Sequence, residues 1–397
     1  METTDSPTKS NLNSICPYFT MFPVEFPLGV LKEGASDSSK VLDPFCGRGT
    51  TVFAARSLGL SALGIDASPI AAAISAAKVV EVDPENVIRT AKNIVGGGKA
   101  VDTPKGEFWD WCFDTATLKE LCRLRDELNR DARSPERIAL RATILGALHG
   151  PKQKTVPGYF SNQAPRTYAP KPAYSVKYWK TRRMKPDRVD VIEVIARRAR
   201  RFFSITPNKN GRVCHGDSRD FDTVLSAAST DEFDWIITSP PYYGMRTYIP
   251  DQWLRNWFLG GPPKVDYGRS GQITHRSPEY FAEDLRKVWR NSSYVARKDA
   301  SLVVLFGGIS DRRASPLEII KLSFSGSNWE IESIEPAGNS SMGKRQADSF
   351  LVKKSKPVNE FIVRARPKPI SELSYSDVIR TIHAKMTIRS AVDGDAH

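Results

Sequence analysis

The order of hydrophobic and polar positions gives the first outline of the fold. Short apolar runs at residues 40–43 and 61–66 each end in an aspartate. Helical spacing follows the first run over residues 50–57 and the second from Ser68-Pro69, where serine and proline form a typical helix start. This strand–helix–strand–helix order predicts the beginning of a parallel α/β sheet.

The pattern changes after residue 83 and returns near residue 211. Residues 84–150 have helical spacing, residues 151–186 have no clear period, and residues 187–203 again predict a helix. Further strands are expected at residues 212–215, 233–238, 301–306, 329–334 and 360–364, with a helix at 278–296. One sheet interrupted by a long insertion explains this order, so we expect an α/β, Rossmann-like fold.

Charge distinguishes the insertion from the sheet. The chain of 397 residues has a net charge of +13. Residues 151–201 hold fourteen Lys/Arg against three acids, a local surplus of +11 (14 − 3). Such a surplus favours a polyanionic partner. The five scattered cysteines fit reduced thiols in a cytoplasmic protein, and no apolar run is long enough to cross a membrane.

A glycine-rich segment, Asp43 to Thr51, joins the first strand to the first helix. This arrangement lets a nucleotide-like ligand approach the backbone closely, although an ordinary strand–helix turn has the same form. A dinucleotide-binding dehydrogenase is a sharper alternative, but its third glycine would fall at position 52, which is Val. Asp66 and Asp217 end the next two strands, at the edge where open α/β sheets bind ligands.

A second informative segment is Ser239-Pro-Pro-Tyr242, directly after a strongly apolar strand. Two prolines fix the backbone and hold a carbonyl and a side chain in one direction. The neighbouring tyrosine offers a ring for stacking. Taken alone, the segment is equally well explained as a rigid loop.

Together, Asp43-Pro-Phe-Cys-Gly-Arg-Gly-Thr-Thr51 and Ser239-Pro-Pro-Tyr242 resemble the amino-group DNA methyltransferase family. The Ser-Pro-Pro-Tyr form is typical of its cytosine-N4 members, whereas adenine-N6 members usually begin the tetrad with aspartate. The similarity covers roughly residues 15–80 and 211–366. Arg48 stands where the family often has serine, which is harmless if its side chain points to solvent.

The resemblance implies a domain order and a cofactor, S-adenosylmethionine. We expect a flexible tail (1–14), a methyltransferase catalytic domain (15–83 and 206–366), a helical and basic insertion for DNA recognition (84–205) and a C-terminal extension (367–397). The cofactor-binding residues that it implies are Phe22, Pro23, Asp43, Phe45, Gly47, Gly49, Thr50, Asp66, Ala67 and Asp217. The sequence predicts no metal site.

The resemblance also implies how the tetrad acts. The Ser239 hydroxyl and the Pro240 carbonyl would accept the hydrogens of an exocyclic base amine, Pro241 would stiffen the turn, and Tyr242 would stack on the base. The base must leave the duplex to reach this site. Four aromatic residues that follow the tetrad either wall the pocket or pack in the core: Tyr243, Tyr248, Trp253 and Trp257.

DNA is the partner that the charge and the resemblance imply, and a cognate restriction endonuclease is a further partner that the family admits. The basic insertion interleaves its cations with aromatic residues that stack on bases or wedge the duplex. The residues expected to contact DNA are Lys177, Lys180, Arg182, Arg183 and Arg246. We therefore expect a site-specific cytosine-N4 DNA methyltransferase. An adenine-N6 enzyme is the first alternative and a catalytically inactive DNA-binding module is a more distant one. The sequence does not indicate an oligomeric state.

Overall fold

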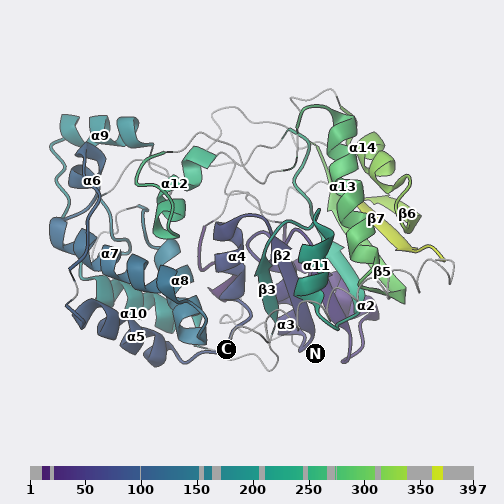
Figure 1. Ribbon diagram of the computed structural model, residues 1–397, viewed down its shortest axis with the longest axis horizontal. Helices are drawn as coiled ribbons and strands as arrows, with labels where there is room; N and C mark the ends of the chain where they lie inside the picture. The colour runs from purple at the N-terminus through teal and green to yellow at the C-terminus, as the bar shows by residue number, and fades with distance from the viewer. Residues whose placement is uncertain are drawn as a thin grey trace, which may run out of the picture.

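A computed structural model shows the α/β Rossmann-like fold that the sequence predicts (Figure 1). It describes residues 11–17, 22–98, 100–151, 156–162, 171–204, 211–244, 249–265, 273, 275–308, 314–337 and 360–369. Seven strands form one sheet in the order β3-β2-β1-β4-β5-β7-β6. Their bounds are β1 Lys40–Asp43, β2 Ser61–Asp66, β3 Arg212–His215, β4 Phe233–Thr238, β5 Ala296–Phe306, β6 Trp329–Pro336 and β7 Phe361–Pro367.

The first five strands are parallel, and β7 lies antiparallel between β5 and β6. β3 pairs with β2 in register, with Asp66 opposite His215, although the whole insertion separates them in the sequence. β1 is central and pairs with both β2 and β4. Its position brings the carboxyl ends of β1, β2 and β4 to the same edge of the sheet.

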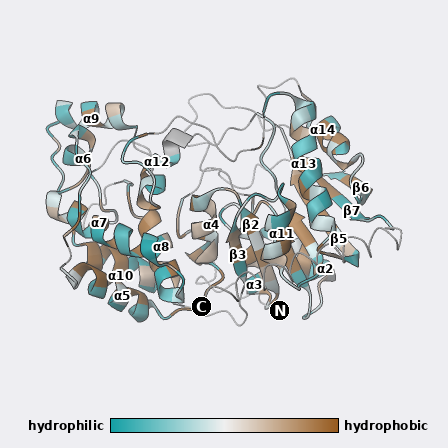
Figure 2. Ribbon diagram, in the orientation of Figure 1, coloured by the Kyte–Doolittle hydropathy of each residue, from teal (hydrophilic) through white to brown (hydrophobic). Residues whose placement is uncertain are grey.

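Helices cover both faces of the sheet because the strand side chains alternate. Val41 faces α2 (Glu25–Gly34) and α3 (Thr50–Ser57). The next residue, Leu42, belongs to the opposite core, with α11 (Phe221–Ala228), α13 (Pro278–Ser293) and α14 (Pro316–Phe324). Both cores exclude water from the middle of the sheet, whose strands are coloured mainly as hydrophobic in Figure 2.

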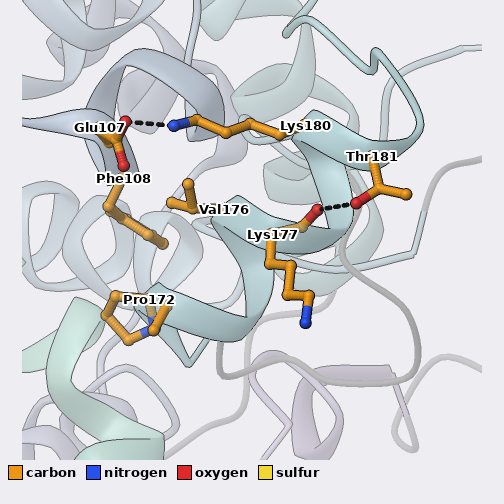
Figure 3. Close-up of a pocket in the computed structure, with 8 residues that line it drawn as sticks. Glu107, Phe108, Pro172, Val176, Lys177, Lys180 and Thr181 are labelled. Carbon is orange, nitrogen blue, oxygen red and sulfur yellow. Dashed lines mark hydrogen bonds and ion pairs between the residues drawn. The ribbon is translucent and has the colours of Figure 1, made fainter.

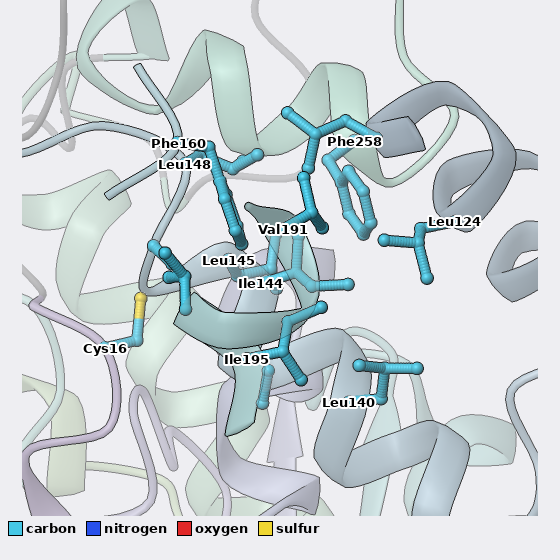
Figure 4. Packing of buried hydrophobic residues seen from close by; sticks show 14 of the residues in the cluster. Cys16, Leu124, Leu140, Ile144, Leu145, Leu148, Phe160, Val191, Ile195 and Phe258 are labelled. Atoms are coloured by element: carbon cyan, nitrogen blue, oxygen red, sulfur yellow. The ribbon is translucent and has the colours of Figure 1, made fainter. Parts of the chain in front are cut away.

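The insertion folds into a helical module beside the sheet (Figure 1). Its helices are α5 Pro84–Gly96, α6 Glu107–Cys112, α7 Thr115–Arg130, α8 Pro135–Leu145, α9 Pro172–Thr181 and α10 Val191–Phe202. Figure 4 shows Leu140, Ile144 and Ile195 converging in its buried core. Helix α4 (Pro69–Ala76), which follows β2, contributes Ile70 and Ile74 to the same core and so joins the module to the sheet.

A seventh helix of this module comes from outside the predicted insertion. α12 (Ile249–Phe258) follows the tetrad in sequence, within the range expected for the catalytic domain. Its Trp253 and Trp257 are only 3% and 2% exposed and pack on Trp109, with ring centroids 5.7 and 4.6 Å apart. The two tryptophans are therefore core residues of the helical module and do not wall a pocket.

The stretch expected to lack periodicity, residues 151–186, contains α9. Pro172 occupies its first turn, where a missing N–H costs nothing. Its residue Trp179 is fully buried on the inner side of the helix. Hydrophilic residues are frequent elsewhere on α9 (Figure 2). Within the described residues, no helix is long and apolar enough to span a membrane.

Candidate cofactor and base site

The glycine loop after β1 has a backbone that only glycine adopts readily. Gly47 and Gly49 have φ angles of 51° and 80°. A Cβ built on Gly49 would lie 2.8 Å from the hydroxyl oxygen of Ser75, and that hydroxyl donates a 2.6 Å hydrogen bond to the Gly47 carbonyl. The loop therefore has both the backbone conformation and the packing that bring a ligand close to the main chain.

Asp66, at the end of β2, holds this loop in place. Its two carboxylate oxygens accept hydrogen bonds from the backbone N–H groups of Gly47 and Ser68, both at 2.8 Å. Burial raises the pKa of Asp66, and the two N–H donors offset part of that effect. Each carboxylate oxygen has a second lone pair, so these bonds leave acceptor capacity for a ligand hydroxyl.

Asp43, at the end of β1, is fully buried. Its Oδ1 accepts hydrogen bonds from the Phe45 N–H at 3.1 Å and from the Thr238 hydroxyl at 2.6 Å. Its Oδ2 has no hydrogen-bond partner among the described residues. Burial raises the pKa of Asp43 from 3.8 to about 6, while the hydrogen bond from Thr238 acts in the opposite direction.

An unpartnered buried carboxylate oxygen costs folding free energy unless a donor binds to it. The charge of Asp43 suits a cationic amine. The amino group of S-adenosylmethionine is such an amine, so the residues present fit this cofactor. The hydrogen bond from Thr238 also places Asp43 beside the tetrad that begins at the next residue, Ser239.

Asp217 follows β3 and is tied to the same edge. Arg219 donates to both of its carboxylate oxygens at 2.6–3.0 Å and also to Asp284 at 2.8 Å. Partial burial would raise the pKa of Asp217, but the hydrogen bonds and charge of Arg219 outweigh it and lower the pKa. The neighbouring Ser218 donates a 2.8 Å hydrogen bond to the Pro44 carbonyl, which fixes this turn against the glycine loop.

The tetrad lies at the end of β4. Ser239 and Pro241 are partly exposed, whereas Pro240 is buried. Tyr242 is 9% exposed, and its hydroxyl donates a 2.9 Å hydrogen bond to Oε1 of Glu360, directly before β7. Its ring meets Phe306 edge-on, with ring centroids 5.6 Å apart.

The segment after the tetrad is described in part. Tyr243 packs edge-on against Phe281 at 5.6 Å, and the Gly244 N–H donates a 3.0 Å hydrogen bond to Nδ1 of His275. Arg246 and Tyr248, two residues expected near the base, lie outside the described residues.

The other predicted cofactor residues lie around the first strand–helix unit. Thr50, the first residue of α3, is 2% exposed and therefore buried. Ala67 is exposed, and its carbonyl lies 3.3 Å from Nε2 of His215. Phe22 meets Phe26 of α2 edge-on at 5.8 Å, and the adjoining Pro23 is exposed.

Arg48 does not point to solvent. It is 5% exposed, burial lowers its pKa to about 10, and its guanidinium donates to the Asn13 carbonyl. Lys78, fully buried, donates a 2.6 Å hydrogen bond to the side chain of Asn13. Arg198 of the helical module donates to the Ile15 carbonyl at 2.9 Å. Residues 13–15 therefore connect the glycine loop to the helical module, and are not part of a loose tail.

The residues expected to contact DNA gather on and after α9. Lys177, Lys180, Arg182 and Arg183 are all exposed. The Lys180 ammonium pairs with Glu107 of α6, and the Arg182 guanidinium lies 3.9 Å from the ring centroid of Tyr178. Figure 3 shows the open groove between α6 and α9, with an apolar floor that includes Phe108. The groove has a volume of about 540 Å³ and belongs to the helical module, away from the tetrad.

Two partners at the sheet edge were not predicted from the sequence. Thr238 is the donor that links Asp43 to the tetrad, and Arg219 is the partner of Asp217. Both are adjacent or nearly adjacent to predicted residues, but only the strand order β1–β4 and the turn after β3 bring their side chains onto the carboxylates.

Known proteins resemble the chain in sequence over its first strands and, at low identity, in fold. The sequence pattern of the DNA methylase family (N6 and N4 methyltransferases) matches residues 2–77, the part that contains β1, the glycine loop and Asp66. No curated protein matches the chain. The chain has a TM-score of 0.36 and 12% identity to the rRNA methyltransferase aviRa from Streptomyces viridochromogenes, covering 92% of this chain and 94% of that one.

A TehB-like SAM-dependent methyltransferase from Corynebacterium glutamicum has a TM-score of 0.32 and 10% identity, with 86% of this chain and 87% of that one covered. TM-scores of this size support no statement about substrate. The sheet order, the geometry of the glycine loop and the DNA methylase match together support an S-adenosylmethionine-dependent methyltransferase.

Proposed function

We propose that the chain is a site-specific DNA methyltransferase that transfers a methyl group to the exocyclic N4 amine of cytosine. The observation that carries the proposal is the hydrogen bond from Thr238 to Asp43. This hydrogen bond places Asp43, the proposed ligand of the cofactor's amine, beside the tetrad, which is the proposed site for the base amine. The DNA methylase match and the Ser-Pro-Pro-Tyr form of the tetrad support DNA and cytosine as the substrate.

Bound S-adenosylmethionine supplies an electrophilic methyl group on a sulfonium. In this proposal Asp43 binds the amine of the cofactor and Asp66 binds its ribose hydroxyls. The backbone of Gly47–Gly49 lies closest to the bound cofactor. Asp217 contacts the adenine while Arg219 fixes the orientation of the carboxylate. Phe22, Pro23, Phe45, Thr50 and Ala67 complete the surroundings.

The chain's own task is to make a poor nucleophile reactive. The lone pair of an exocyclic amine is delocalised into the base ring. Ser239 Oγ and the Pro240 carbonyl each accept a hydrogen bond from one N–H of the amine. These two hydrogen bonds draw the nitrogen toward tetrahedral geometry and free its lone pair. Pro241 keeps these acceptors rigid, so positioning supplies most of the rate enhancement.

Tyr242 stacks on the extruded base in this proposal. Its hydroxyl is anchored by Glu360 and its ring by Phe306, so the ring is held in one orientation before the base arrives. A ring that is ordered in advance loses little entropy on binding.

Mass spectrometry of nucleosides tests the proposal, using DNA from cells that express the protein or its Ser239→Ala variant. We expect N4-methylcytosine with the wild type and none with the variant. N6-methyladenine in its place would assign the enzyme to adenine. If neither base appeared in DNA that contains both cytosine and adenine in all contexts, the DNA substrate would be rejected.

A further inference from the structure

The exposed side of α9 carries an ordered stack of planar groups. Tyr174, Tyr178 and Arg182 follow one another at four-residue steps, which places them along one side of the helix. The rings of Tyr174 and Tyr178 are nearly parallel, with an interplanar angle of 23° and centroids 6.5 Å apart. The Arg182 guanidinium lies over Tyr178 at 3.9 Å, so Tyr174 forms the open end of the stack.

Tyr174 is unusual among the aromatic residues of the insertion because its ring is available. It is 56% exposed, whereas Trp179 and Phe160 are buried at 0% and 1% and Tyr178 is partly covered. Of the aromatic side chains described in this region, Tyr174 is the one that presents most of a ring to a ligand.

The charge around Tyr174 selects the kind of ligand. Residues 171–185 contain six Lys or Arg and no acid. Lys177 lies one helical turn from Tyr174, at an adjacent surface position, and lines the groove of Figure 3. An exposed ring beside several cations matches a nucleotide, with the base on the ring and the phosphate near the ammonium.

We propose that Tyr174 stacks on an unpaired base of the bound DNA, outside the catalytic site, with Arg182 and Lys177 near the adjoining phosphates. This inference rests on DNA being the substrate. The base must be unpaired and out of the helical stack, because stacked neighbours cover both faces of a base within a duplex. Extrusion of a target base leaves its former partner unpaired and able to leave the stack, and a single-stranded flank offers the same chemistry.

Competition binding tests this inference with three probes: a fully paired duplex, the same duplex with one bulged base, and the single strand. For the wild type we expect tighter binding to the bulged duplex or the single strand than to the paired duplex. Tyr174→Ala should lose about 5-fold to 100-fold of that preference, the usual size of one base–aromatic stack. Tyr174→Phe should keep it, because the ring remains.

Leu322→Ala is the matched control. Leu322 is 40% exposed on α14, at the opposite end of the molecule from α9 (Figure 1). Its truncation removes an exposed apolar side chain without touching the stack, so the preference should not change. If only the bulged duplex loses affinity in Tyr174→Ala, the base comes from a disrupted pair, and if only the single strand does, it comes from a flank.

Three results would count against the inference and are distinguishable from one another. Equal preferences in the wild type and Tyr174→Ala, with DNA methylation intact, would overturn the stacking role alone. Loss of self-association in Tyr174→Ala with unchanged DNA binding would make this face an interface between two copies of the chain. Absence of salt-dependent DNA binding by the wild type would reject the DNA substrate and the inference together.

Discussion

Charged side chains at the sheet edge and on the surface of α9 lie in opposite environments. At the sheet edge, the carboxylates of the buried Asp43 and the half-buried Asp66 are held by hydrogen bonds from Thr238 and from backbone N–H groups. On α9, Lys177 and Tyr174 are exposed. Buried charges demand exact partners, whereas exposed charges gain little from any single contact. We therefore expect changes at the edge to act strongly on folding and cofactor binding, and changes on α9 to act weakly on folding and selectively on DNA binding.

The glycine loop should give the largest effect. Gly49 and Gly59 both have positive φ, at 80° and 74°, but only Gly49 has no room for a methyl group. Gly59→Ala should cost about 1 to 2 kcal/mol of unfolding free energy from backbone strain. Gly49→Ala adds overpacking against Ser75, about 1 to 3 kcal/mol more. Urea titration measures both.

Equal losses of stability in the two alanine variants would contradict this reading. They would mean that strain alone governs the loop and that the close approach of Ser75 to Gly49 is unimportant. A larger loss in Gly49→Ala would establish that the loop's packing, as well as its dihedral angles, excludes a side chain.

How far the sequence predicts this edge depends on distance along the chain. The apolar runs before Asp43 and Asp66 identify strands, and parallel strands bring their carboxyl ends together, so the sequence predicts where both acids lie. The partners could not. Thr238 approaches Asp43 only because β4 pairs with β1, a contact between residues far apart in sequence.

The helical module was less predictable for a related reason. Helix α9 begins at Pro172, within a stretch where proline and cations hide the helical period, and it is stabilised by burial of Trp179. Trp257 belongs to the module although it follows the tetrad in sequence. Its ring packs on Trp109, and its carbonyl accepts a hydrogen bond from Arg125. The buried Arg48 likewise finds its hydrogen-bond acceptor at Asn13, a contact that sequence spacing does not predict.

Asp43→Asn should separate folding from cofactor binding. The folded pKa of Asp43 is about 6, against 3.8 as the ordinary value. The folded protein therefore binds this proton more tightly, and its unfolding free energy falls by about 3 kcal/mol as pH rises from below 4 to above 6. An asparagine keeps the acceptor for Thr238 and removes the titration, so its stability should lack this decline.

Cofactor binding should change in the opposite direction. The affinity of the wild type for S-adenosylmethionine should rise as pH passes through 6, because the ionised carboxylate is the form that holds an amine. Asp43→Asn should bind about 10-fold to 100-fold more weakly at pH 7, with no such rise. Calorimetry of both proteins across pH isolates Asp43, since Asp66 titrates in each. Parallel pH profiles would remove Asp43 from the cofactor site.

The smallest effect is expected from single lysines on α9, and it sharpens the comparison because two of them differ in one respect. Lys177 has no ion pair among the described residues, whereas Lys180 is paired with Glu107. Lys177→Gln should weaken DNA binding several-fold and reduce the slope of log Kd against log salt by about 1, as loss of one phosphate contact does. Lys180→Gln should change the slope less, because Glu107 already offsets its charge.

Lys321→Gln, which removes an exposed lysine from α14 at the far end of the molecule, is the control for net charge. If all three variants shift the slope equally, binding follows the total charge of the protein, and α9 is not a specific contact surface. If Lys177 stands apart while all three proteins unfold at the same urea concentration, the cations of α9 serve the ligand and contribute nothing to the fold, which is the opposite of what Asp43 and Asp66 do at the sheet edge.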